Sequence, residues 1–352
     1  MTEPTSLPIF LLISIVKIAV VLVITLTAVA YTVLLERKVL GRMQNRWGPS
    51  RVGPFGLLQP LADGIKLFLK EDMMPLAVER PLFVLAPVIA LGCALISIAV
   101  VPFGAPYTYK GVDITQIANI NVGLLVVLGV TSIGVYGIAL SGWSSNNKYS
   151  LFGSLRATAQ VISYELALGL SLVGVVMRAG SLNLRHIVDS QSAHGALSWN
   201  ICGGLQIVAF FIYLMAAYAE TNRSPFDLPE AESELVAGYH TEYSSMKFAM
   251  FFMAEYANMI TVACVATLLF FGGASSPFGH VFHFGNGPRV QVLFSIFWFV
   301  SKILAFILLY IWVRATLPRF RYDQLMGFGW KFLLPVAMIN ILATALALAY
   351  HG

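Results

Sequence analysis

The sequence contains few charged residues. Lys, Arg, Asp and Glu together make up 11% of its 352 residues, whereas soluble domains carry about 25%. Hydrophobic residues reach 58%, and the mean hydropathy is +0.79. A chain of this composition has too few polar side chains to cover a water-exposed surface. We therefore predict a single integral membrane domain over residues 1–352 rather than one or more soluble domains.

Residues that hold redox cofactors are also scarce. The three cysteines, Cys93, Cys202 and Cys264, form no CxxC pair, and we interpret them as small buried hydrophobes. The histidines lie outside the apolar runs, which leaves a membrane haem without paired ligands. The sequence has neither GxGxxG nor GxxxxGKS/T, so it predicts no dinucleotide or ATP site. No metal site is expected, and any redox centre that the protein serves should belong to a partner.

Long apolar runs, by contrast, are abundant. A membrane helix needs about 20 mostly apolar residues, and the sequence offers eight such runs: 9–35, 82–101, 122–140, 157–177, 201–219, 248–271, 290–313 and 332–350. The sequence therefore predicts an all-α polytopic fold with eight transmembrane helices. Sixteen Lys and Arg residues lie in the odd-numbered connections and four in the even-numbered ones. The positive-inside rule then places the odd connections in the cytoplasm and both termini on the outer side.

The first cytoplasmic connection, residues 36–81, contains a further helical pattern. Between residues 57 and 69, Leu, Ile and Phe recur at helical spacing, while Asp63, Lys66 and Lys70 fall on the other face. This pattern predicts a short helix lying at the membrane interface. The connection carries a net charge of +3, whereas residues 221–247 carry −3. We expect these two connections to dock together.

Acidic residues gather in residues 221–247 and continue into neighbouring spans. The line consists of Glu165, Glu220, Glu230, Glu232, Glu234, Glu242 and Glu255. Its loop members could simply begin a helix, with Asp227 as the capping residue. Glu165 and Glu255, however, lie about 12 Å inside their spans, where a carboxylate is costly unless it is paired, hydrated or protonated. A pair with Lys302 is the structural alternative, but the continuous line favours proton or charge transfer.

Four stretches of the sequence point to a family. They read "ERKVLGRMQNRWGP", "RVGPFGLLQPLADGIKLFLKED", "AETNRSPFDLPEAESELVAGYHTEYSSMKFAMFFMAEYANM" and "WVRATLPRFRYDQLMGFGWKFLLP". Through these stretches, and over essentially its whole length, the chain resembles the quinone-module membrane subunit of respiratory complex I. This family comprises the H-type subunit of the bacterial NADH:quinone oxidoreductase and subunit 1 of the mitochondrial enzyme.

The resemblance implies a non-redox subunit of a proton-pumping translocase in the bacterial inner membrane. It implies a tunnel for ubiquinone or menaquinone, with flavin and iron–sulfur clusters in soluble partner subunits and with small and antiporter-like membrane subunits as further partners. Carried over residue by residue, it assigns Glu36, Arg37, Arg46 and Asp63 to the quinone site. It assigns the seven glutamates above to an acidic path that couples quinone reduction to proton translocation, supported by Arg223 and Asp227.

Three other functions compete with this interpretation. The homologous membrane subunit of a membrane-bound hydrogenase binds no quinone, but the intact acidic connection and the RFRYDQLM stretch favour complex I. A stand-alone ion transporter or channel would use Glu165, Glu255 and Lys302. A purely structural membrane anchor is the third alternative.

Overall fold

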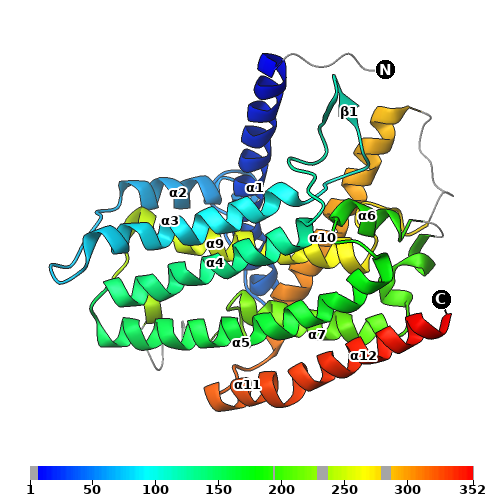
Figure 1. The fold of residues 1–352 in the computed structure, drawn as a ribbon. Helices are drawn as coiled ribbons and strands as arrows, with labels where there is room; N and C mark the ends of the chain where they lie inside the picture. The colour runs from blue at the N-terminus through cyan, green and yellow to red at the C-terminus, as the bar shows by residue number, and fades with distance from the viewer. Residues whose placement is uncertain (1–6, 193–194, 228–236, 279–286, 352) are drawn as a thin grey trace.

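The computed structural model describes residues 7–192, 195–227, 237–278 and 287–351 (Figure 1). Over these residues the fold is α-helical. Its one hairpin joins two short antiparallel strands, β1 (Thr108–Tyr109) and β2 (Val112–Asp113). The prediction of an all-α polytopic protein is confirmed.

Seven segments of the described chain are long and apolar enough to cross a membrane. They are α1 (Leu7–Met43), α3 (Arg80–Ser97, extended by a 3₁₀ turn at Ile98–Val100), α4 (Gly123–Ser144), α5 (Lys148–Ala179), α9 (Ser245–Phe270), α10 (Pro288–Thr316) and the unit of α11 (Tyr322–Phe328) and α12 (Leu334–His351). A π-helical turn, Gly329–Leu333, joins α11 to α12. The fifth predicted span is the apolar α7 (Leu205–Glu220), which has only 16 residues.

The remaining elements are short. They are α2 (Gln59–Leu69), α6 (Leu184–Asp189) and the 3₁₀ turns η1 (Pro54–Gly56), η3 (Gly195–Ser198), η4 (Asn200–Cys202) and η5 (Gly238–His240). Helix α2 is the predicted interfacial helix. None of its residues is buried, and Leu61, Ile65 and Phe68 are exposed along its apolar face. An amphipathic helix with an uncovered apolar face suits the boundary between bilayer and water.

The helices form a bundle crossed by two outer helices. In Figure 1, α3, α4, α5 and α12 run side by side, whereas α1 and α10 cross their direction. Helix α9 is the most buried of the long helices and contacts α1, α3 and α10. The buried face of α5 is rich in small residues such as Gly153, Ala157 and Ala167. Small residues let membrane helices approach closely, which strengthens packing where no hydrophobic driving force exists.

Over their described residues, the two oppositely charged connections contact each other, as we expected. The individual pairs, however, are not those that the net charges suggest. The hydroxyl of Ser245 donates to the carbonyls of Leu67 and Lys70 at 3.0 and 2.9 Å. An ion pair between the connections joins Lys247 to Asp72 at 2.8 Å. In this pair the cation comes from the acidic connection and the acid from the basic one.

The lysines inside the spans bind backbone carbonyls. Lys302 of α10 donates to the carbonyls of Phe271, Gly273 and Ser275 at 2.7–2.8 Å, just beyond the end of α9. The alternative of a Glu–Lys302 pair is therefore wrong. Lys17 of α1 similarly donates to three carbonyls in residues 113–117, beside the β1–β2 hairpin.

One cysteine also departs from expectation. Cys93 and Cys264 are buried, as predicted, but Cys202 is exposed. It ends η4, just before α7, where the chain runs over the surface of the bundle.

Close packing at Gly153 leads to a stability prediction. A Cβ at this position would lie 2.8 Å from the Cα of Gly238, which is backbone and cannot rotate away. We expect Gly153→Ala to lower the free energy of unfolding by about 1–3 kcal/mol, as overpacking does. Gly169→Ala on the same helix meets nothing within 4 Å and is the matched control. Thermal denaturation of the detergent-solubilised protein would test this, and equal melting temperatures for the two variants would contradict it.

Candidate functional site

A buried carboxylate on α1 contacts two guanidinium groups and one tyrosine hydroxyl from three other parts of the chain. Glu36 is 4% exposed. It accepts a hydrogen bond from the Tyr256 hydroxyl at 2.7 Å and one from the Arg314 guanidinium. Arg223 lies 3.6 Å from the same carboxylate, and its guanidinium stacks 4.0 Å from the centre of the Tyr256 ring. We call these four residues the Glu36 cluster.

The sequence explains why the cluster forms. Thr25, Val29, Thr32 and Glu36 are all buried and recur every three or four residues, so they share one face of α1. Arg314 lies in the last turn of α10, where a cation is favourable beside the carbonyl ends of a helix.

Arg223 remains charged in this cluster although it is buried. It lies in the tight turn after α7, where its N–H bonds the Tyr218 carbonyl. Burial by itself would lower the pKa of the Arg223 guanidinium, but Tyr256, Glu36 and Glu255 together hold that pKa above its ordinary value. The cluster therefore contains a permanent positive charge next to a buried carboxylate.

A second, more exposed ion pair lies at the start of the first connection. Arg37 donates to Asp63 at 2.7 Å, and Gln59 donates to the same carboxylate at 3.1 Å. The structure thus brings two of the four predicted quinone-site residues together. Glu36, next to Arg37 in the chain, belongs to the buried cluster instead, and the exposed Arg46 bonds Gln44 at 2.8 Å.

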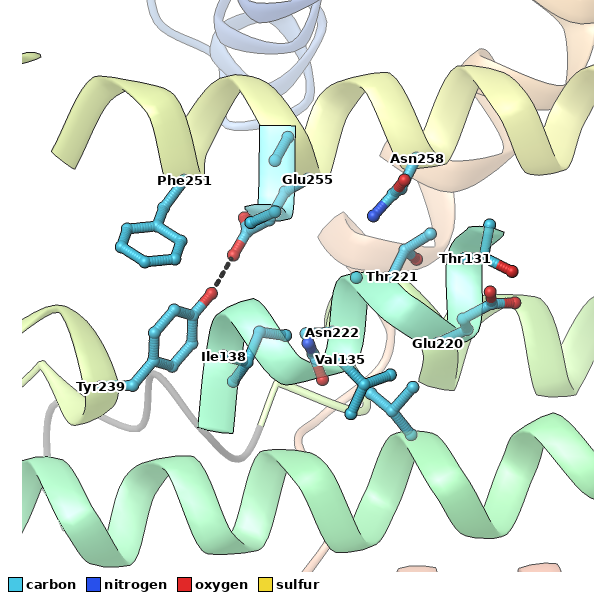
Figure 2. A pocket seen from close by; sticks show the side chains of 14 residues that line it. Thr131, Val135, Ile138, Glu220, Thr221, Asn222, Tyr239, Phe251, Glu255 and Asn258 are labelled. Carbon is cyan, nitrogen blue, oxygen red and sulfur yellow. Dashed lines mark hydrogen bonds between the residues drawn. The ribbon is translucent and has the colours of Figure 1, made fainter. Parts of the chain in front are cut away.

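Two acids of the predicted path line a small cavity between α4, α7, α9 and η5 (Figure 2). Its volume of about 40 Å³ is enough for water. Glu220 enters from the end of α7, beside Thr131 of α4, and Glu255 enters from α9. The Tyr239 hydroxyl donates to Glu255 at 2.9 Å, and Asn258 points toward the same space. The cavity therefore combines two carboxyls with hydroxyl and amide groups.

The other described acids have polar partners outside this cavity. Glu165 of α5 hydrogen-bonds the Ser132 hydroxyl of α4. Glu242 accepts a hydrogen bond at 2.6 Å from Asn147, the residue that also caps the start of α5. Asp227 accepts one from Arg319 at 3.0 Å. The remaining predicted acids, Glu230, Glu232 and Glu234, lie outside the described residues.

A buried histidine lies close to this site. His240 packs against the rings of Tyr239, Phe248 and Phe251. Burial lowers its pKa to about 3. The imidazole is therefore neutral near pH 7 and does not add positive charge to the site.

Several residues of the site were not assigned from the sequence. Arg314 and Arg319 lie within the WVRATLPRFRYDQLM stretch, but their acidic partners are 278 and 92 residues away in the chain. Tyr256 directly follows Glu255, and a tyrosine beside an intramembrane acid was the available signal. Thr131, Ser132 and Asn147 look like ordinary helix residues until the acids are placed next to them.

These features define a class of protein. The chain is a polytopic membrane protein with a buried carboxylate–guanidinium cluster and with carboxyls on three of its apolar helices. Comparison with known families identifies the family: residues 16–345 match the family model described as NADH dehydrogenase, and the chain belongs to this family.

Curated relatives cover nearly the whole chain, and all three named here are H-type subunits of an NADH-quinone oxidoreductase. The chain is 62% identical to the second such subunit of Koribacter versatilis, over 98% of this chain and 99% of that protein. It is 49% identical to the first such subunit of Solibacter usitatus, over 97% and 98% of the two chains. It is 51% identical to the corresponding subunit of Leptospira biflexa, over 95% and 94%.

The Glu36 cluster leads to a second stability prediction. Glu36→Gln removes the charge that Arg223 and Arg314 share, and losing one partner of a buried ion pair costs about 3–5 kcal/mol. Adding Arg314→Met to Glu36→Gln should cost less than the sum of the two single changes, because both remove the same interaction. Thermal denaturation of all three variants would measure this coupling.

The exposed pair Arg321–Asp323 provides the control for this cycle. Its side chains are 78% and 68% exposed, and exposed pairs contribute only about 0–1 kcal/mol. Arg321→Met should therefore leave the melting temperature nearly unchanged. Strict additivity of Glu36→Gln and Arg314→Met would show that the two side chains do not act together.

Proposed function

We propose that this chain is the membrane subunit of a proton-pumping NADH-quinone oxidoreductase that forms part of the quinone site and an acidic path leading away from it. The Arg37–Asp63 pair and the Glu36 cluster lie on the quinone side. Glu165, Glu220, Glu242 and Glu255 belong to the path. Residues 36–81 and 221–247 form the cytoplasmic surface that receives the soluble subunits.

One observation carries this proposal: short lengths of chain join the residues of the cavity to the Glu36 cluster. Glu255 lines the cavity and the next residue, Tyr256, donates to Glu36. Glu220 lines the cavity and Arg223, three residues later, contacts Glu36. A charge change near Glu36 therefore acts on groups that are directly linked to the carboxyls of the cavity.

The electrostatic interaction between such groups is strong enough to change their protonation states. With an effective dielectric constant of about 20, one unit charge changes the energy of another about 8 Å away by about 2 kcal/mol. A change of about 1.4 kcal/mol alters a protonation equilibrium tenfold. Reduction of a quinone adds two electrons, whose negative charge remains until two protons neutralise it, so the charge next to such groups changes during turnover. The carboxyls of the acidic path can therefore change protonation in response to quinone reduction without any redox cofactor on this chain.

An apolar groove supports the assignment of a quinone. It has a volume of about 980 Å³ and lies between α1, α9 and α10. At one end it reaches Lys38 and Leu57, next to the Arg37–Asp63 region, and its walls include Ala28, Ile260 and Ile303. Such a groove suits the polyprenyl tail of a quinone, because pockets for apolar ligands are lined mainly by apolar side chains.

The proposal includes partners and orientation. Electrons reach the quinone from a terminal iron–sulfur cluster in a soluble partner subunit, and flavin belongs to another partner. Small and antiporter-like membrane subunits continue the acidic path. The positive-inside rule and the bacterial relatives support placement in the bacterial inner membrane with both termini outside.

The first functional prediction concerns the exposed pair. Arg37 and Asp63 are 44% and 23% exposed, and such pairs contribute little to stability. Asp63→Asn and Arg37→Ala should therefore lower quinone reductase activity without reducing assembly. Asp72→Asn, which removes another ion pair of the same connection, is the matched control. NADH oxidation by an artificial acceptor reports assembly, and equal loss of both activities would reveal a structural defect instead.

The second functional prediction concerns Glu255. Glu255→Gln keeps the volume of the side chain and its hydrogen bond with Tyr239, but it cannot titrate. Proton translocation and quinone reductase activity should fall in membranes with normal amounts of the complex, since the path needs a group that changes charge. Glu255→Asp, which keeps the charge, should retain more activity. Wild-type translocation by Glu255→Gln would show that the path runs elsewhere.

A further inference from the structure

The apolar groove between α1, α9 and α10 continues beyond the end of α9. Lys302 of α10 donates to the Phe271 carbonyl, so this level of α10 lies where α9 ends. The lining of the groove on α10 nevertheless reaches Val292, which lies about 15 Å further along that helix. Another element therefore forms the wall of the groove at this far end, which is opposite the end next to the Arg37–Asp63 pair.

The β1–β2 hairpin forms this wall. In Figure 1 the hairpin stands between α1 and the start of α10. Phe103, which leads into the hairpin, packs edge-on against Phe299 of α10, with 6.2 Å between the ring centres. Five residues in and beside the hairpin line the groove: Phe103, Tyr107, Tyr109, Ile114 and Thr115. The hairpin therefore bounds the far end of the groove.

The hairpin is attached to both helices that form the sides of the groove. On α1, the Lys17 ammonium donates to three carbonyls in residues 113–117 at 2.9–3.2 Å. An ammonium has three hydrogens to donate, and these three bonds use all of them. On α10, the Ser295 hydroxyl accepts a hydrogen bond from the Ala105 backbone N–H at 2.9 Å. The hairpin thus bridges α1 and α10, and Lys17 serves the hairpin rather than a ligand.

A third attachment joins the hairpin to α6. The Arg185 guanidinium bonds the Asp113 carboxylate and the Thr115 hydroxyl, the latter at 2.9 Å. Asp113 also accepts hydrogen bonds from the backbone and the side chain of Thr115 at 2.9 and 2.8 Å. The two strands pair over only two residues each, and so short a ribbon is not stable by itself. The position of the hairpin therefore depends on its attachments.

The groove has the length of a long polyprenyl tail. Its lining on α1 runs from Leu12 to Lys38, which is about 39 Å of helix. An extended chain advances about 1.2 Å per bond, so a five-carbon isoprene unit with four chain bonds covers about 5 Å. A long tail of about eight units therefore reaches the hairpin when the headgroup lies next to the Arg37–Asp63 pair. A short tail of one or two units ends near that pair.

We propose that the β1–β2 hairpin is the stop for the quinone tail: it ends the groove and sets the length of tail that the chain binds. The inference rests on the proposed function, in which the groove holds that tail. Lys17 is a positioning residue, because it acts through the hairpin. Contacts between the hairpin and the end of the tail are the same before and during the reaction. They therefore change the KM for long-tailed quinones and leave kcat unchanged.

Shortening one side chain of the hairpin tests the stop in the assembled complex. Ile114 is 42% exposed, so Ile114→Ala should have little effect on folding. The KM for a long-tailed quinone should rise about fivefold, the effect of losing contact with one or two methylene groups. The KM for a short-tailed quinone and both kcat values should stay at wild type. Ile120→Ala is the matched control, because this residue of the same connection is similarly exposed, at 37%, and does not line the groove.

Releasing the hairpin from α1 is the second test. Lys17→Met removes the three carbonyl contacts and should raise the ratio of the long-tail KM to the short-tail KM. Lys302→Met removes a similar set of three contacts from a residue that does not line the groove, and it should leave this ratio at wild type. The ratio does not depend on the amount of assembled complex. A wild-type ratio in both Lys17→Met and Ile114→Ala would overturn the stop.

Photolabelling of the wild-type complex gives a readout that needs no substitution. A long-tailed quinone with a diazirine at the end of its tail should label residues 103–115, as mapped by mass spectrometry of peptides. A short-tailed quinone with the same group should label the near end of the groove, around Leu35 and Leu57. Long-tail labels that fall outside residues 103–115 would overturn the stop.

A third probe separates this inference from the proposed function. It is a long-tailed quinone with the diazirine on its headgroup, which should label the chain next to the Arg37–Asp63 pair. Headgroup labels at that pair, with tail labels outside residues 103–115, overturn the stop and leave the quinone site intact. Labels of both probes confined to other subunits overturn the quinone site and the stop together.

Discussion

The interaction on which the site depends is the buried contact of Glu36 with two guanidinium groups and a tyrosine hydroxyl. A carboxylate in a region of low dielectric constant is stable only with such partners. Its partners come from the turn after α7, from α9 and from α10, so one acid of α1 fixes the relative positions of four parts of the chain. Together with the carbonyl contacts of Lys17 and Lys302, it holds α1 and α10, whose surface lies mostly outside the bundle.

The turn that carries Arg223 is held from the opposite side by a buried amide of α5. The Gln160 Nε2 lies 2.9 Å from the Ala219 carbonyl and 2.8 Å from the Phe226 carbonyl. Phe226 in turn packs against Tyr164, one turn further along α5. These contacts direct Glu220 to the cavity and Arg223 to Glu36, although the two residues are only three apart. The local geometry of one turn thus determines which groups Glu220 and Arg223 contact.

The sequence predicted the elements that depend on local composition. Apolar runs located the spans, and helical spacing located α2, because both signals arise within about 20 residues. The start of α7 was harder to predict. Its apolar run begins at Ile201, but because a 3₁₀ turn and glycines precede Leu205, the helix begins only at Leu205. The resemblance to a family assigned Glu220 and Glu255 to one path, and the structure places both in one cavity.

Partners across long sequence separations could not be predicted in the same way. Nothing in the chain around Arg314 or Glu36 shows that they meet, because their contact depends on how α1 and α10 cross. Net charge predicted that the two connections contact each other, but it did not predict the individual pairs: Lys247 and Arg223 belong to the acidic connection, yet they pair with Asp72 and Glu36 of the basic one. Individual pairs follow the position of each side chain rather than the total charge of a segment.

The lysine contacts have a consequence for charge balance in the membrane. Lys302 and Lys17 donate to backbone carbonyls, so their ammonium groups do not act as counterions for the carboxyls of the path. In the proposed function, positive charge that compensates Glu165 or Glu220 would therefore arrive as mobile protons. The region would then store charge as a capacitor does, with fixed carboxyls and mobile protons, and its stored charge would follow the charge at the Glu36 cluster.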